Sequence, residues 1–193
     1  MRTFTSLILP SIFLLQSSCS NDDIEIPEFD IYAAKNLWEY KPLINNNTLN
    51  LDTVELSEEP FLTLDKIGRY DTANHIIMLK GSKYDLKYPD MRLSGQLFVV
   101  SINKEPVYGG FFWDINSSQP CRWVVILKPP DGIPDNQIKI GLGYATDTIV
   151  GTDPRSDPRV IEAFRKSGKL IYAPQTVVFK FAGNAGRLVV RPA

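Results

Sequence analysis

The most regular feature of the chain is a strand-like run of apolar residues that is densest within Gln96–Leu127. This stretch predicts a hairpin, turning at Asn103–Pro106, and then a third strand. Every residue in Leu97–Val100 is apolar, so both faces of the first strand require cover, as in the centre of a sheet. Gly109 and Gly110 interrupt the returning strand and predict a bulge or the close approach of another backbone. We expect the rest of the fold to be built around this stretch.

Shorter runs on either side predict the remaining elements. Further strands are expected at Glu28–Ala34, His75–Lys80, Ile138–Tyr144, Thr176–Phe181 and Arg187–Val190. Gly81–Gly95 has no apolar period and predicts a long loop. Pro158–Ser167 predicts the one clear helix, because Asp157 precedes it as an N-cap and Gly168 follows as a C-terminal stop. The pattern therefore predicts an α+β fold, a single sheet-rich domain of mixed or mostly antiparallel strands over residues 28–193.

The composition fits one globular domain and excludes one class of partner. The chain has 193 residues, of which 44% are hydrophobic and 22% charged, and it can therefore bury a sizeable core. Its formal net charge is −1, so it lacks the basic surplus on which nucleic-acid binding depends. We therefore expect no nucleic-acid partner.

Residues 1–18 have the organisation of an export signal. Met1 and Arg2 are followed by the apolar run Leu7–Leu15, which is too short to span a bilayer stably. Small polar residues then precede Cys19, as at the end of a signal peptide. We expect this segment to direct export and to take no part in the fold.

The residues around Cys19 resemble a lipidation signal. The segment LLQSSC is similar to that of bacterial lipoproteins, although Gln16 stands where an aliphatic residue is usual, and Ser20–Asp23 resembles the acidic export tail of Bacteroidetes-type lipoproteins. The resemblance implies that Cys19 carries lipid such as palmitate, that residues 19–27 form a flexible spacer, and that the protein is anchored in the outer membrane or at the cell surface. Only Cys121 then remains, and no internal disulfide is possible.

Part of the body resembles the periplasmic head of the protein-export component SecD. The similarity lies in Leu62–Ile67 (LTLDKI), in Ile76–Leu79 and in the hairpin sequence LFVVSINKEPVYGG. It departs at Gly81–Gly95, where that family has a helix, and the chain lacks the membrane spans that SecD needs for transport. The resemblance therefore bears on the fold and says nothing about the activity of this chain.

The sequence contains no motif of the common enzyme classes. It has no Gly-x-Ser-x-Gly elbow, phosphate loop or dinucleotide fingerprint. His75 is the single histidine, which excludes multi-histidine zinc sites, and we expect it on a strand face with Ile77 and Leu79. Cys121 has no base nearby in the sequence and is expected to be a buried thiol. We therefore predict a protein that is not an enzyme and holds no cofactor or metal.

Two Asp-Pro-Arg triplets, beginning at Asp153 and Asp157, form the densest charge pattern. One interpretation is ordinary turn and helix-start chemistry. The other is a ligand site, in which Arg155 and Arg159 bind an anion at the helix N-terminus, or the two aspartates hold calcium together with Asp147. An envelope enzyme that uses Asp153 and Asp157 with a bound metal is the corresponding alternative function.

Aromatic residues in the returning strand offer a second candidate site. Phe111 and Trp113 share one face and Phe112 takes the other, so the first two predict either core residues or a platform that binds a sugar or peptide. Together the patterns predict a non-catalytic envelope lipoprotein that binds a partner protein, a glycan or another extracellular ligand. A third possibility is an accessory subunit of an envelope complex, which a large exposed apolar patch would favour.

Overall fold

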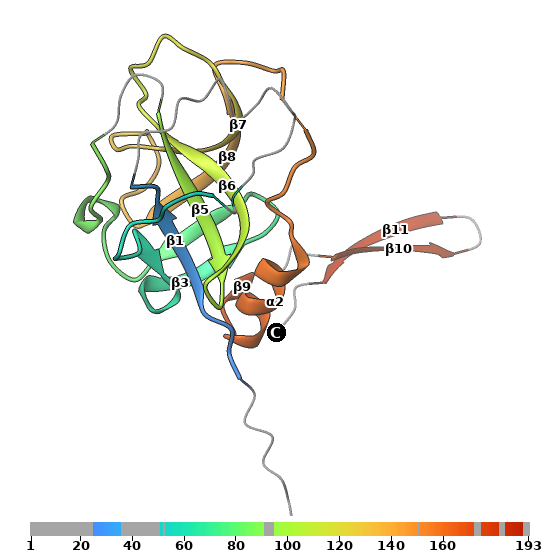
Figure 1. The fold of residues 1–193 in the computed structure, drawn as a ribbon. Helices are drawn as coiled ribbons and strands as arrows, with labels where there is room; N and C mark the ends of the chain where they lie inside the picture. The colour runs from blue at the N-terminus through green and yellow to red at the C-terminus, as the bar shows by residue number, and fades with distance from the viewer. Residues whose placement is uncertain are drawn as a thin grey trace, which may run out of the picture.

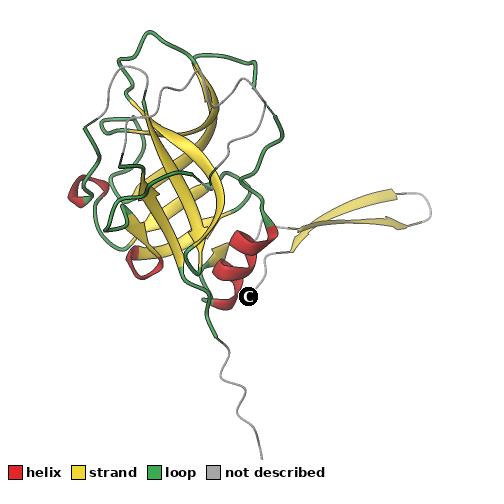
Figure 2. Cartoon of the chain, in the orientation of Figure 1, coloured by secondary structure: helices red, strands yellow, loops and turns green. Residues whose placement is uncertain are grey.

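The computed structural model describes residues 25–35, 51, 53–90, 95–149, 151–171, 175–181 and 184–190, and gives the backbone for the last two ranges. The predictions for the export signal, residues 1–18, and for Cys19 lie outside the described residues. Within the described part, nine strands form one mixed sheet and one α-helix packs against it (Figure 1). Figure 2 shows how strands dominate the body. The fold is therefore α+β and mostly β.

The elements follow one another across a single sheet. In sheet order the strands are β2 (Leu62–Thr63), β1 (Phe29–Ala33), β5 (Gln96–Ile102), β6 (Glu105–Trp113), β7 (Cys121–Leu127), β8 (Gln137–Tyr144), β4 (Ile76–Leu79), β3 (Ile67–Asp71) and β9 (Leu170–Ile171). The pairs β6–β7 and β3–β9 are parallel and the others antiparallel. The helical elements are η1 (Leu64–Lys66), η2 (Lys83–Asp85) and α2 (Pro158–Lys166). The hairpin of β10 (Gln175–Phe181) and β11 (Asn184–Val190) projects from the body (Figure 1).

The sheet curls until its two ends approach each other. β2 and β3 lie near opposite ends of the strand order, yet only η1 separates them in the sequence. Helix α2 packs at this junction, because the Phe164 ring lies 4.8 Å from the ring of Phe29 in β1 and stacks at 4.6 Å on that of Tyr70 in β3, measured between centroids. The inner face of the curled sheet and the helix together enclose the hydrophobic core.

The stretch Gln96–Leu127 lies at the middle of this sheet, as predicted. β5 is buried along its whole length between β1 and β6, so both of its faces are covered. The close approach of another backbone is confirmed at Gly110, where a Cβ atom would lie 2.8 Å from the carbonyl oxygen of Val124. The Phe98 ring, which was not foreseen, would lie closer still, with Cζ at 2.3 Å. The turn is shorter than predicted, because only Asn103–Lys104 lies outside the two strands.

The predicted helix is confirmed as α2, which ends at Lys166. The Asp157 side chain accepts a hydrogen bond from the Arg159 amide, and Pro158 occupies the first turn. Gly168 has φ of 68°, the left-handed conformation that glycine adopts after a helix. The local sequence therefore specifies both ends of α2.

Near the turn between β3 and β4, one strand was not predicted from the sequence and the start of another was misplaced. β3 was not predicted, because the register shifts between Ile67 and Arg69 and breaks the alternation of buried residues. The prediction that a strand begins at His75 is wrong: His75 lies in the turn with φ of 52°, and β4 begins at Ile76. Tertiary pairing with β8 and β9 holds these short strands, which their own sequences specify weakly.

Candidate functional site

The aromatic residues predicted to bind a ligand are core residues in this structure. Phe111 and Trp113 are both 0% exposed. The Trp113 ring is covered by Gly95, where a Cβ atom would lie 2.4 Å from the ring, and its indole N–H donates to the carbonyl of Gln119 at 3.3 Å. A sugar or peptide stacks on an exposed ring, so this burial does not support the predicted platform.

In each Asp-Pro-Arg triplet the arginine pairs with the aspartate of the same triplet. Arg155 donates from Nε and Nη2 to Asp153, at 2.8 and 2.7 Å, and from Nη1 to the carbonyl of Ile140 at 2.8 Å. Arg159 donates in the same way to Asp157, at 3.0 and 2.9 Å. The arginines hold the pKa of Asp153 and that of Asp157 below the usual aspartate value. Each arginine is therefore already paired with a carboxylate, which disfavours the predicted anion site.

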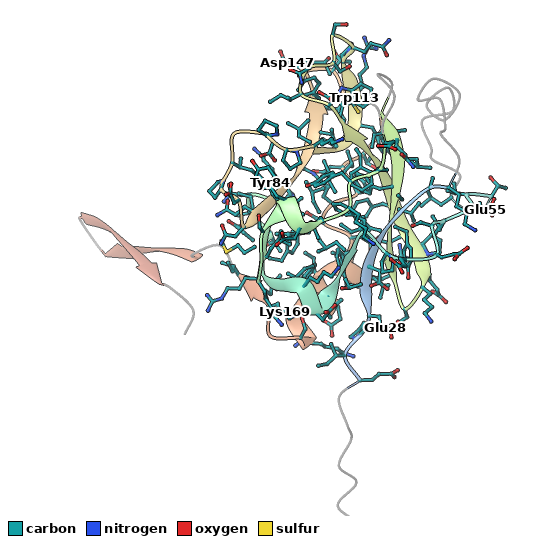
Figure 3. The ribbon with its side chains drawn as sticks, turned by 90° about the vertical axis from the view of Figure 1, so that its left-hand side faces the viewer. Glu28, Glu55, Tyr84, Trp113, Asp147 and Lys169 are labelled. Carbon is teal, nitrogen blue, oxygen red and sulfur yellow. The ribbon has the colours of Figure 1, made fainter. Side chains whose placement is uncertain are left out.

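The predicted calcium ligands do not come together either. Asp153 and Asp157 turn to their own arginines, and Asp147 is exposed at the end of the body opposite Glu28 (Figure 3). Over the described ranges, no three His, Cys, Asp or Glu side chains are grouped so that they could hold a metal ion. Asp153 instead accepts from the Arg155 amide in a turn, and Asp157 caps the start of α2.

His75 belongs to a buried polar cluster with Tyr70 and Tyr108. Its Nδ1 atom lies 3.0 Å from the Tyr70 hydroxyl, and its carbonyl accepts from the Ile140 amide at 2.9 Å. Burial, and then the charge of Arg155, lower the pKa of His75, and burial raises the pKa of Tyr70 and that of Tyr108. The cluster is therefore uncharged near neutral pH, and it contains no activated nucleophile.

The best candidate site is a pocket on the surface of β7 and β8, closed at one end by the loop that joins them. Its volume is about 330 Å³, within the range of small-molecule sites. The lining residues are Val125, Leu127, Asp131, Ile133, Lys139, Gly141, Leu142 and Gly143. We call this the β7–β8 pocket.

Glycines on the outer face of β8 let neighbouring side chains pack directly on its backbone beside the pocket. Ile138 and Ile140 point into the core, as the alternation predicts, and Gly141 pairs with Val125 of β7. A Cβ atom at Gly141 would lie 3.1 Å from Cγ1 of Val125, and one at Gly143 only 2.6 Å from Cδ1 of Ile149. Gly143 also has φ of 83°, which favours glycine. The alternation was visible in the sequence, but the hollow it leaves was not.

A buried ion pair builds the polar wall of the pocket. The Lys83 ammonium pairs with Oδ1 of Asp131, and the exposed fractions of the two side chains are only 1% and 6%. Lys83 also donates to the carbonyl of Ile133 at 2.9 Å, and its amide donates to that of Asp135 at 2.7 Å. Sequence reasoning missed this pair, because Lys83 lies in the predicted long loop and its partner is 48 positions away.

A second hollow lies at the start of β1, where Glu28 and Lys169 mark the end of the body that the N-terminal segment joins (Figure 3). Its volume is about 490 Å³. Burial, and then the charge of Glu28, raise the pKa of Asp30, and burial lowers the pKa of Lys169, whose ammonium donates to the carbonyl of Leu64. Lys169, the one cationic side chain among the described residues that line this second hollow, is thus already bonded to the backbone. We therefore take the β7–β8 pocket as the stronger candidate.

Comparison with protein-family models, with curated proteins and with solved structures found no match for this chain. Searched over its described residues, the protein has no helix with the length and apolarity needed to cross a membrane. In the same part of the chain, the exposed large apolar side chains are Ile26, Tyr84 and Ile115, which belong to three separate segments. With only three such side chains over the described residues, the described surface gives no particular support to the complex-subunit interpretation.

Proposed function

We propose that the protein is a lipid-anchored, non-catalytic component of the bacterial cell envelope whose sheet-rich domain binds a partner protein or an extracellular ligand. The observation that carries the proposal is the position of Cys19, directly after an export signal and before the acidic stretch Ser20–Asp23. A doubly acylated cysteine anchors a protein stably, because each buried methylene contributes about 0.8 kcal/mol.

The start of the domain supports this arrangement. β1 begins at Phe29, and residues 20–28 can span at most about 30 Å when fully extended. A lipid on Cys19 would therefore hold the body near the membrane surface, with the end that carries Glu28 and Lys169 facing the bilayer (Figure 3). The end that carries Asp147 would face away from it, where a ligand is accessible.

Binding without catalysis is favoured by the chemistry of the body. The carboxylates proposed for the enzyme alternative, Asp153 and Asp157, are each engaged by a neighbouring arginine. His75 has a lowered pKa and a tyrosine as its ring partner, and neither group is an activated nucleophile. The β7–β8 pocket supplies a hollow of the size that small ligands occupy.

Metabolic labelling with palmitate tests the anchor. We expect the wild-type chain to incorporate label and fractionate with membranes, and Cys19→Ala to do neither. Cys121→Ala is the matched control, because Cys121 is the only other cysteine and is buried, and it should label like the wild type. Equal labelling of the wild type and Cys19→Ala would contradict the proposal.

A further inference from the structure

We infer that the β7–β8 pocket binds a small organic anion with an apolar body. The inference rests on the proposed function, since it names a ligand class for a domain that is taken to bind ligands. Three observations support it: the apolar walls of the pocket, the charge of Lys139, which no described residue pairs, and the Asp131 carboxylate that Lys83 holds in place.

The walls of the pocket suit an apolar group. Val125 and Leu127 project from β7, and Leu142 and Ile133 complete the apolar lining. Gly141 and Gly143 let Cγ1 of Val125 and Cδ1 of Ile149 pack closely on β8, which adds to the apolar character of this part of the surface. The volume of about 330 Å³ limits the occupant to a small molecule.

The charges of the pocket favour an anion. Asp131 and Lys139 are the ionisable side chains among its lining residues, and the Lys83 ammonium already neutralises Asp131. Lys139 is exposed, and no described residue forms an ion pair or a side-chain hydrogen bond with its ammonium group. The net charge that faces a ligand is therefore positive, and a carboxylate, sulfonate or phosphate can pair with it.

The buried ion pair keeps Lys139 available. Oδ1 of Asp131 accepts from the Lys83 ammonium and from the Ile133 amide at 3.4 Å, so the carboxylate is fixed on the wall and does not neutralise Lys139. A buried pair of this kind adds little to stability, because desolvation offsets its attraction, but it holds a set geometry. The anionic group then lies beside Lys139, and the apolar body lies against Val125 and Leu127.

Fluorescence titration with two probes tests the inference on the full-length chain carrying Cys19→Ala, which keeps lipid out of the assay. The probes are 8-anilinonaphthalene-1-sulfonate and the neutral N-phenyl-1-naphthylamine, which has similar rings without the sulfonate. We expect saturable binding of one sulfonate per chain, weakened about tenfold by Lys139→Gln, as loss of one charge-assisted contact predicts. The neutral probe should bind more weakly and be insensitive to this substitution.

Lys80→Gln is the matched control, because Lys80 is another exposed lysine and does not line the pocket. It should bind the sulfonate like the parent chain, and near-UV circular dichroism should be the same for all three proteins, since loosely folded chains also bind this dye. The inference is overturned if the sulfonate does not bind, if Lys139→Gln binds it like Lys80→Gln, or if both probes bind equally. A chain that incorporates palmitate but fails these titrations retains the proposed anchor and loses this pocket.

Discussion

Replacing Gly110 by alanine tests the packing at the centre of the sheet. The new Cβ atom would lie 2.3 and 2.7 Å from two ring carbons of Phe98 and 2.8 Å from the carbonyl oxygen of Val124. Carbon atoms in contact are about 3.5–4.0 Å apart, so the overlap with the ring exceeds about 1 Å. The ring cannot turn away easily, because it is 0% exposed and its centroid lies 5.2 Å from that of Phe112. Phe98 or β7 must therefore shift.

Overpacking of a tight core costs about 1–3 kcal/mol, and we take the upper value because one of the clashing atoms belongs to the backbone. Alanine also lowers the conformational entropy of the unfolded chain, which offsets about 0.4–1 kcal/mol of this loss of stability. We therefore expect Gly110→Ala to lower the free energy of unfolding by about 2 kcal/mol, which corresponds to a fall in Tm of about 4–8 °C for a domain of this size.

Urea denaturation followed by tryptophan fluorescence measures this loss, since Trp113 and Trp123 are both buried. Gly109→Ala is the control and should lose less, because its nearest contact is a side-chain atom of Leu51 at 3.1 Å. In a Phe98→Leu background the ring is gone and Gly110→Ala should be better tolerated. Unchanged stability of Gly110→Ala, or the same loss in both backgrounds, would refute this account of the packing.

Two further predictions concern the buried polar groups. Lys83→Met should lower the free energy of unfolding by about 3–5 kcal/mol in urea denaturation, because it leaves the Asp131 charge buried without its partner. The double variant Lys83→Met with Asp131→Leu should recover much of this stability. A double variant as unstable as Lys83→Met alone would contradict the reasoning. The free energy of unfolding should also fall as the pH drops from 7 to 5, because the pKa of His75 in the folded protein lies below the unfolded value of 6.5 and the unfolded chain takes up the proton first. His75→Asn, which tolerates the φ of 52°, should remove this part of the pH dependence, and identical pH profiles for both proteins would exclude His75 as its source.

The elements that the sequence predicts well are those whose signals are local. Asp157, Pro158 and Gly168 mark the ends of α2 within a dozen positions. The apolar run Leu97–Val100 predicts a strand that is buried on both faces. β3 escapes the same reasoning, because its bulge breaks the alternation and its partners are β4 and the distant β9. The burial of Trp113 also depends on Gly95, which no periodicity of β6 reveals.

The candidate site was also predictable only in part. The sequence shows the alternation of apolar residues in Ile138–Tyr144 with Lys139 and two glycines, and it shows the signal that precedes Cys19. The pocket depends on the loop between β7 and β8, because Asp131 and Ile133 of this loop line it. Lys83, which bonds both residues, lies 48 positions from Asp131 in the sequence. Periodicity reports which residues share a face, whereas pairing between distant segments sets which faces meet. For this protein the sequence determines the long strands, the helix and the candidate anchor. The tertiary structure decides the short strand β3, the burial of the aromatics and the hollow beside Lys139.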